Sequence, residues 1–116
     1  MKRGDIWTLH DGRYASKARP VVLVQHDFAG FDSVIVCLLT SFNRRGTPSR
    51  VSVEPTPTNG LNKTSYVMAD KLLTVSQDEL GDRVGNLTDE QVHEVSCSLA
   101  RVLAIGRSQA QPDPSD

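Results

Sequence analysis

The sequence predicts an α+β domain in which a compact, barrel-like antiparallel sheet is followed by one long C-terminal helix. Short runs rich in β-branched and apolar residues, separated by turn residues, fill roughly the first three quarters of the chain. Apolar residues then recur at three- and four-residue intervals. With 116 residues, 38% of them hydrophobic, the chain has the material for one core, and we expect a single domain over residues 1–106.

Six segments have the composition of strands. They are residues 4–9, 20–25, 33–39, 50–54, 65–75 and a last short strand at 83–87. The second and third are continuous apolar runs (PVVLVQ and SVIVCLL), which indicates burial on both faces. We therefore expect these two to pair as a hairpin in the centre of the sheet. Between the last two strands, Ser76 and Glu79 form a capping-box pattern that predicts one short helical turn.

The long helix is predicted to begin at the capping box of residues 88–91 and to end near Ile105, with Gly106 as its stop. One face is apolar and is expected to pack on the sheet. That face consists of Val92, Val95, Leu99, Val102 and Leu103. Residues 107–116 are polar and contain two prolines, so we expect a disordered tail.

Composition excludes several classes of function. The chain lacks a run of about 18 apolar residues, and its first residues lack the apolar core of a secretory signal, so we expect a cytoplasmic protein with no membrane partner. Cys37 and Cys97 are far apart and stand in no metal-ligand pattern, which favours reduced thiols. Phosphate loops, nucleophile elbows and metal-ligand clusters are also absent from the sequence. We therefore expect neither a metal ion nor a cofactor.

The net charge of −1 conceals an uneven distribution. Residues 1–75 contain ten Lys or Arg against six Asp or Glu, a net +4, while the remainder carries three against eight, a net −5. A basic sheet joined to an acidic helix suits a phosphate-binding surface, although ordinary scatter of surface charge explains the same numbers equally well.

Polar groups at the ends of the buried strands are the candidates for chemistry. Arg19 precedes Pro20, which favours an extended backbone there and so sets the direction of a guanidinium suited to phosphate. Thr40 and Ser41 end a buried strand and offer two hydroxyls, and Asp70 interrupts an apolar one. Each also has a purely structural interpretation, such as a hydrogen bond to its own loop. His10 and His26 are weaker candidates for a general base, whereas His93 is expected on the solvent face of the helix.

Four segments carry a resemblance to a known family. They are residues 2–7 (KRGDIW), 19–25 (RPVVLVQ), 34–40 (VIVCLLT) and 65–75 (SYVMADKLLTV). In this order they resemble the MazF/PemK/Kid toxins, the killing halves of bacterial toxin–antitoxin modules. The resemblance implies a homodimer of SH3-like barrels that cleaves single-stranded RNA at a short sequence without a metal. It also implies a cognate antitoxin whose C-terminal segment covers the RNA site.

The resemblance also assigns roles. Arg19 and Thr40 fall on the positions to which the family's catalysis is most often assigned, and Asp70 falls on an acidic position that some members use. Residues 11–18 depart from the family pattern, so the cleavage sequence does not transfer, and Met68 stands where some relatives have a second catalytic arginine. Chemistry alone suggests further RNA contacts, because an aromatic ring among cations and hydroxyls suits an unpaired base and its phosphates. These candidates are Arg13, Tyr14, Lys17, Ser41 and Ser65.

The implied mechanism is attack of a ribose 2′-hydroxyl on the adjacent phosphorus, leaving a 2′,3′-cyclic phosphate. Arg19 would stabilise the developing phosphoryl charge and Thr40 would donate a hydrogen bond. The general base is open between Asp70 and Arg19 itself. Two rivals remain: a toxin of the same fold that poisons DNA gyrase and cuts nothing, and a degenerate member that binds RNA or an antitoxin without turnover.

Overall fold

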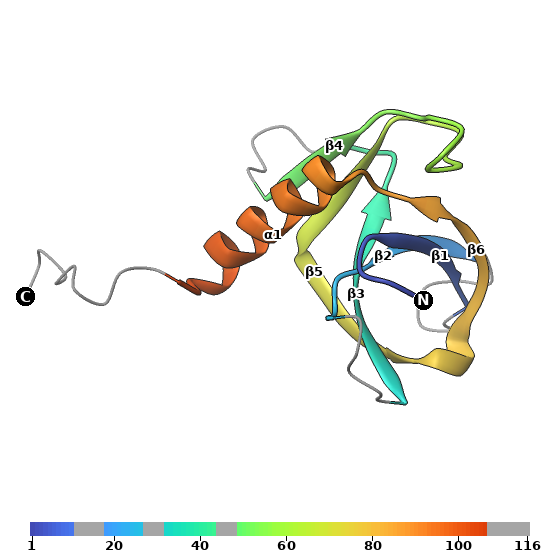
Figure 1. Cartoon of the computed structure of the whole chain (residues 1–116), viewed down its shortest axis with the longest axis horizontal. Helices are drawn as coiled ribbons and strands as arrows, with labels where there is room; N and C mark the ends of the chain where they lie inside the picture. Colours follow the sequence, from blue (N-terminus) through green and yellow to red (C-terminus); the bar gives the residue numbers. More distant parts are fainter. Residues whose placement is uncertain (11–17, 27–31, 44–48, 107–116) are drawn as a thin grey trace, which may run out of the picture.

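The computed structural model describes residues 1–10, 18–26, 32–43 and 49–106. In this part of the chain, antiparallel strands form one sheet and a single long helix follows them (Figure 1). The strands are β1 (Asp5–Leu9), β2 (Arg19–Leu23), β3 (Ser33–Thr40), β4 (Arg50–Val53), β5 (Ser65–Ser76) and β6 (Leu80–Asn86). A 3₁₀ turn (Gln77–Glu79) links β5 to β6, and the helix α1 spans Asp89–Leu103. The predicted α+β architecture is confirmed.

The strand order is β4-β5-β3-β2-β1-β6, so β2 and β3 are neighbours inside the sheet, as their continuous apolar runs predict. Alternate side chains of the strands build two apolar clusters, one on each face. The cluster on the helix side is Ile6, Val22, Cys37, Leu39, Val51, Val53, Val67, Leu87 and Val95. The other is Leu9, Val21, Leu23, Val34, Val36, Leu38, Met68 and Val75.

The expected barrel is realised only in part, because within the described residues the sheet does not close and β4 and β6 remain its two edges. The segment between β4 and β5 packs against β6 without forming a strand. The Asn86 amide donates to the Thr58 carbonyl at 3.1 Å. At Gly60, with φ +69°, a Cβ would stand 2.3 Å from the Val84 carbonyl oxygen, so only glycine permits this approach.

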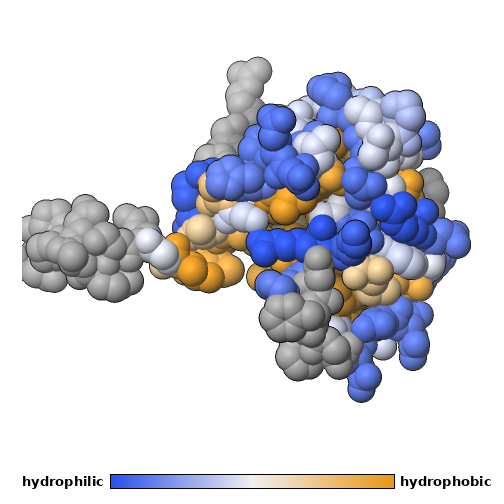
Figure 2. All heavy atoms as spheres, viewed as in Figure 1, coloured by the Kyte–Doolittle hydropathy of each residue, from blue (hydrophilic) through white to orange (hydrophobic). Residues whose placement is uncertain are grey.

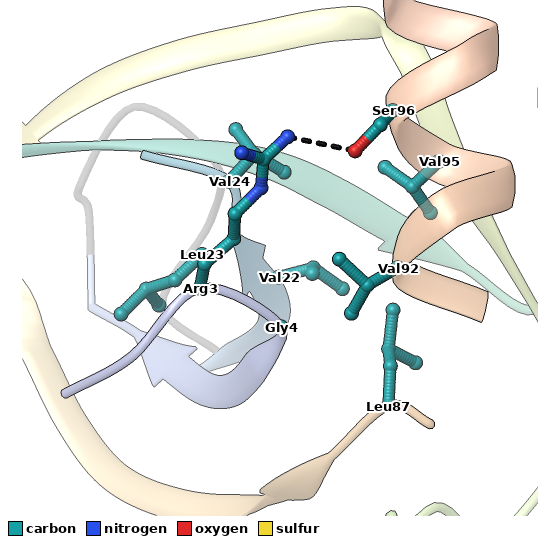
Figure 3. A pocket seen from close by; sticks show the side chains of 9 residues that line it. All are labelled: Arg3, Gly4, Val22, Leu23, Val24, Leu87, Val92, Val95 and Ser96. Carbon is teal, nitrogen blue, oxygen red and sulfur yellow. Dashed lines mark hydrogen bonds between the residues drawn. The ribbon is translucent and has the colours of Figure 1, made fainter. Parts of the chain in front are cut away.

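Helix α1 begins as predicted, with a capping box in which the Thr88 hydroxyl accepts from the Gln91 amide and the Gln91 side chain accepts from the Thr88 amide. Val92 and Val95 pack toward Val22 and Leu87, leaving a cavity of only about 10 Å³ (Figure 3). Two polar contacts fix the helix further. A guanidinium nitrogen of Arg3 donates to the Ser96 hydroxyl at 2.7 Å, and the Ser98 hydroxyl donates to the Ser49 carbonyl at 3.0 Å.

The end of the helix corrects one expectation. Val102 and Leu103, predicted to pack on the sheet, are 42% and 48% exposed, because the last turn extends beyond the edge of the sheet (Figure 1). The helix ends at Leu103, with Ala104 in the left-handed conformation, ahead of the predicted stop at Gly106. Apolar surface therefore gathers at this end of the molecule, as Figure 2 shows beside the grey trace.

The described helix is too short and too polar to cross a membrane. Residues 107–116, for which a disordered tail is expected, lie outside the described residues.

Candidate active site

A pocket of about 700 Å³ lies where the start of β2 and the end of β3 meet the segment that precedes β5. Hydroxyls, an amide and two cations line its rim, and aliphatic side chains form its base. The described lining residues are Thr8, Ala18, Arg19, Pro20, Leu39, Thr40, Ser41, Gly60, Leu61, Asn62, Lys63, Ser65 and Val84. Four of the candidates from the sequence are thus brought together here: Arg19, Thr40, Ser41 and Ser65.

Strand pairing places Arg19 and Thr40 at the same end of one hairpin. The pairing of β2 with β3 ends at Val21 and Leu38, and Arg19 and Thr40 each lie two residues beyond this pair, where both line the pocket. Arg19 is exposed and lines the pocket, and among the described residues its guanidinium has no hydrogen-bond or ion-pair partner. A planar, permanently charged donor group in that position is matched to a phosphate.

The hydroxyl of Thr40 has a defined orientation. Its Oγ1 accepts a hydrogen bond from the Phe42 amide at 3.1 Å, which uses a lone pair and leaves the hydroxyl proton to be donated. Thr40 is half-buried beside the exposed Arg19. The two groups together offer a charged fork and one neutral donor to the same anion.

The opposite wall is built by a turn centred on Asn59, a residue that the sequence did not single out. Asn59 is 2% exposed, and its side-chain oxygen accepts from the amides of Thr56 and Leu61 at 2.9 and 3.0 Å. Its side-chain nitrogen donates to the Glu54 carbonyl at 2.7 Å. A buried amide with its donor and acceptor both used holds the backbone rigidly. This wall is therefore preorganised.

The turn carries Asn62 and Lys63 to the pocket, and both side chains are exposed. The sequence provided little signal for either, because a lone lysine in a polar loop is ordinarily a solvated surface residue. Ser65, a candidate RNA contact, is 7% exposed and donates its hydroxyl to the Lys63 carbonyl at 3.0 Å. It therefore shapes the turn that presents Lys63, and its proton is already used.

Asp70 is not part of this pocket. It lies four residues along β5 from Tyr66, the partner of Thr40, which is roughly 13 Å along the strand. Its carboxylate accepts from the Ser49 hydroxyl at 2.9 Å and from Arg50 Nε at 3.2 Å. Burial acts to raise the pKa of Asp70, but these hydrogen bonds and the Arg50 charge outweigh it and lower that pKa. Asp70 is thus an ionised partner of Arg50.

The described lining of the pocket contains neither a carboxylate nor an imidazole. His10, His26 and His93 all lie elsewhere; His93 is exposed on α1, as expected, with its Nε2 3.5 Å from the Cys97 sulfur. Burial, with a smaller effect of the Asp70 charge, raises the pKa of Cys37 to about 12, so this thiol is inert in the core. The remaining RNA-contact candidates, Arg13, Tyr14 and Lys17, lie outside the described residues.

Comparison with known proteins extends the resemblance. The family model described as the PemK-like, MazF-like toxin of type II toxin–antitoxin systems matches residues 2–103. A probable endoribonuclease MazF of Mycolicibacterium smegmatis is 37% identical over 90% of this chain and 98% of its own length. Endoribonuclease MazF6 of Mycobacterium tuberculosis is 32% identical over 81% of this chain and 85% of its own.

Solved structures agree with this result. A mycobacterial endoribonuclease in complex with its cognate antitoxin superposes with a TM-score of 0.77 at 28% identity, covering 93% of this chain and 99% of that one. The Mycobacterium tuberculosis toxin MazF-mt6 gives 0.74 at 25% identity, covering 89% and 98%. A sheet-plus-helix fold with an arginine and a threonine at one pocket, matched over nearly its whole length, places this chain in the PemK-like, MazF-like family of type II toxins.

Proposed function

We propose that this protein is a toxin that cleaves single-stranded RNA at a short sequence, without a metal ion, at the pocket that contains Arg19 and Thr40. The observation that carries the proposal is that the Arg19 guanidinium and the Thr40 hydroxyl line one pocket that is large enough for a nucleotide. The related proteins named above as endoribonucleases support the substrate class.

In the proposed reaction a ribose 2′-oxygen attacks the adjacent phosphorus and the bond from phosphorus to the 5′-oxygen breaks. The products are a 2′,3′-cyclic phosphate and a 5′-hydroxyl that has taken up a proton. Charge accumulates on the non-bridging oxygens, where the Arg19 fork and the Thr40 proton are placed to receive it. Lys63 adds a second positive charge to the rim and suits a flanking phosphate.

The general base follows less directly from the geometry. The carboxylate of Asp70 points to Ser49 and Arg50, and its lowered pKa makes it a weak base. Arg19 lies in the pocket, but its guanidinium is charged at any ordinary pH, so it acts there as a donor to the phosphate and could accept a proton only after losing its own. A pH–rate profile of Asp70→Asn tests the other candidate, because an unchanged profile excludes Asp70.

Arg19→Ala tests the central assignment. Loss of one preorganised donor to a developing oxyanion typically costs about 2.7–4 kcal/mol in the barrier, so kcat should fall roughly 10²- to 10³-fold. The assay incubates the protein with long single-stranded RNA in EDTA and maps the ends. Cleavage by Arg19→Ala at the wild-type rate would refute the assignment, and loss of wild-type cleavage in EDTA would refute metal independence.

We further propose that the protein is a cytoplasmic homodimer and that a cognate antitoxin neutralises it. The complex of the related mycobacterial endoribonuclease with its own antitoxin supports the antitoxin partner. A groove of about 300 Å³ between the last turns of α1 and strands β3 and β5 is the best candidate for the dimer surface. Leu72, Leu103 and Ile105 line it, at 39%, 48% and 61% exposure. Uncovered apolar surface of this kind is typical of interfaces.

The gyrase-poison alternative finds no support in these comparisons, since the relatives described above are named as endoribonucleases or toxins. It also provides no reason for an arginine and a threonine to converge on a pocket. Intact RNA together with inhibited gyrase supercoiling would restore it.

A further inference from the structure

The side chain of Phe42 has no structural role in the described fold. It is 68% exposed, more than any other large apolar side chain in the described part of the chain. It lies two residues beyond the end of β3 and belongs to neither apolar cluster. Burial of an aromatic ring stabilises a fold by a few kcal/mol, and in the described part of the chain the Phe42 ring gains little of this stabilisation.

The backbone of Phe42 is held in place relative to the reacting group. Its amide donates to the Thr40 hydroxyl oxygen at 3.1 Å, which closes a tight turn between the two residues. The Phe42 amide nitrogen is thus in direct contact with the Thr40 hydroxyl oxygen, so the residue that carries the ring is held next to that hydroxyl. The same hydrogen bond that orients Thr40 therefore anchors the backbone of Phe42, which directly follows the pocket-lining residue Ser41.

The surroundings of Phe42 distinguish between two uses of an exposed ring. The exposed apolar side chains Leu103 and Ile105, near the C-terminus, line one groove together with Leu72, as apolar side chains at protein interfaces do. Phe42 instead stands in the chain between the exposed polar residues Ser41 and Asn43, and the pocket that Ser41 lines also carries Arg19 and Lys63. A single ring among cations and polar groups is the arrangement that holds unpaired bases by stacking.

We propose that Phe42 is a stacking platform for the base next to the scissile phosphate, and thus a residue that sets binding of the RNA. This inference rests on the proposed ribonuclease function and adds to it the position of one base. Removal of the ring weakens binding and leaves the chemical step in place, because Arg19 and Thr40 are unchanged.

The test compares Phe42→Ala, Phe42→Leu, Phe42→Tyr and Phe42→Trp in cleavage of an RNA oligonucleotide centred on the mapped cut. Stacking of one base is worth a factor of roughly 5 to 150 in affinity, so KM of the Ala and Leu variants should rise by that factor with kcat within about twofold. Tyr and Trp keep a ring and should retain the wild-type KM. Melting temperatures confirm that each variant is folded.

A binding measurement separates this inference from the proposed function. The same oligonucleotide with a 2′-deoxy sugar at the cut lacks the attacking hydroxyl, so it binds without being cleaved. A base stacked on the new ring of Phe42→Trp should quench its fluorescence. The quenching should exceed that of the wild type, whose single tryptophan is Trp7. A wild-type protein that cuts no RNA refutes the proposed function. If the wild type cleaves RNA and either Phe42→Ala or Phe42→Leu retains the wild-type KM, the stacking inference is refuted while the ribonuclease proposal stands. A fall in kcat at constant KM also refutes the stacking inference, and assigns Phe42 to positioning Thr40.

Discussion

Replacement of Asn59 by alanine removes the residue that organises one wall of the pocket. Its buried side chain makes three hydrogen bonds, to the amides of Thr56 and Leu61 and to the carbonyl of Glu54. Each is worth about 1 kcal/mol net, so Asn59→Ala should lower the free energy of unfolding by about 3 kcal/mol. For a domain of this size that is a fall in Tm of roughly 12 °C.

Catalysis should also suffer at temperatures where the variant is folded. The turn that Asn59 holds presents Asn62 and Lys63 to the pocket, so its loosening should raise KM for RNA. Thr58→Ala is the matched control, since this exposed side chain of the same turn makes no hydrogen bond to any described residue, and its backbone carbonyl accepts from Asn86 of β6 whatever the side chain. The assays are thermal melts and cleavage kinetics of both variants. If Asn59→Ala melts within about 1 °C of Thr58→Ala, the wall is not held as argued.

Three further predictions follow from other parts of the structure. Lys63→Ala should weaken RNA binding at low salt. In a salt titration it should reduce the slope of log K against log salt by about 0.7, the contribution of one phosphate contact on a single strand. An unchanged slope would show that Lys63 does not contact the RNA phosphates. The lowered pKa of Asp70 means that its ion pair stabilises the fold above the ordinary carboxyl pKa of about 4 and is lost as pH falls through the lower folded value. Denaturation at several pH values should therefore find Asp70→Asn less stable than wild type at pH 7 and equal to it in strong acid, and a gap independent of pH would contradict this. Leu103→Glu puts a charge in the apolar groove, so light scattering should show that this variant is a monomer where the wild type is a dimer. A variant that remains a dimer would exclude the groove as the dimer interface.

Much of the fold can be predicted from local patterns, because those patterns act within a few residues. The capping boxes at Ser76 and Thr88 both form, and the hairpin of β2 and β3 lies inside the sheet as its apolar runs require. Val102 and Leu103 are the counterexample. Their helical spacing predicts an apolar face, but it carries no information on how far the sheet extends beneath that face.

The candidate site was predictable in the same uneven way. Arg19 begins one strand and Thr40 ends the next, so the hairpin predicted from the two apolar runs already brings them to the same end of the sheet. Asp70 interrupts an apolar strand in just the same manner, yet it faces Ser49 and Arg50 on the β4 side. An irregularity in the pairing of β3 with β5, between Cys37 and Leu38, separates it from the pocket, and a bulge of this kind leaves little trace in sequence.

The sequence by itself thus determined which segments are strands and helix, where the helix begins, the family, and the meeting of Arg19 with Thr40. Only the tertiary structure decided that a turn held by Asn59 walls the pocket, that Lys63 stands at its rim, and that Asp70 does not. The physical reason is one of range. Alternation, capping and strand pairing depend on neighbouring residues, whereas a pocket forms where distant loops are brought together by the curvature of the sheet and by buried hydrogen bonds that no periodicity records.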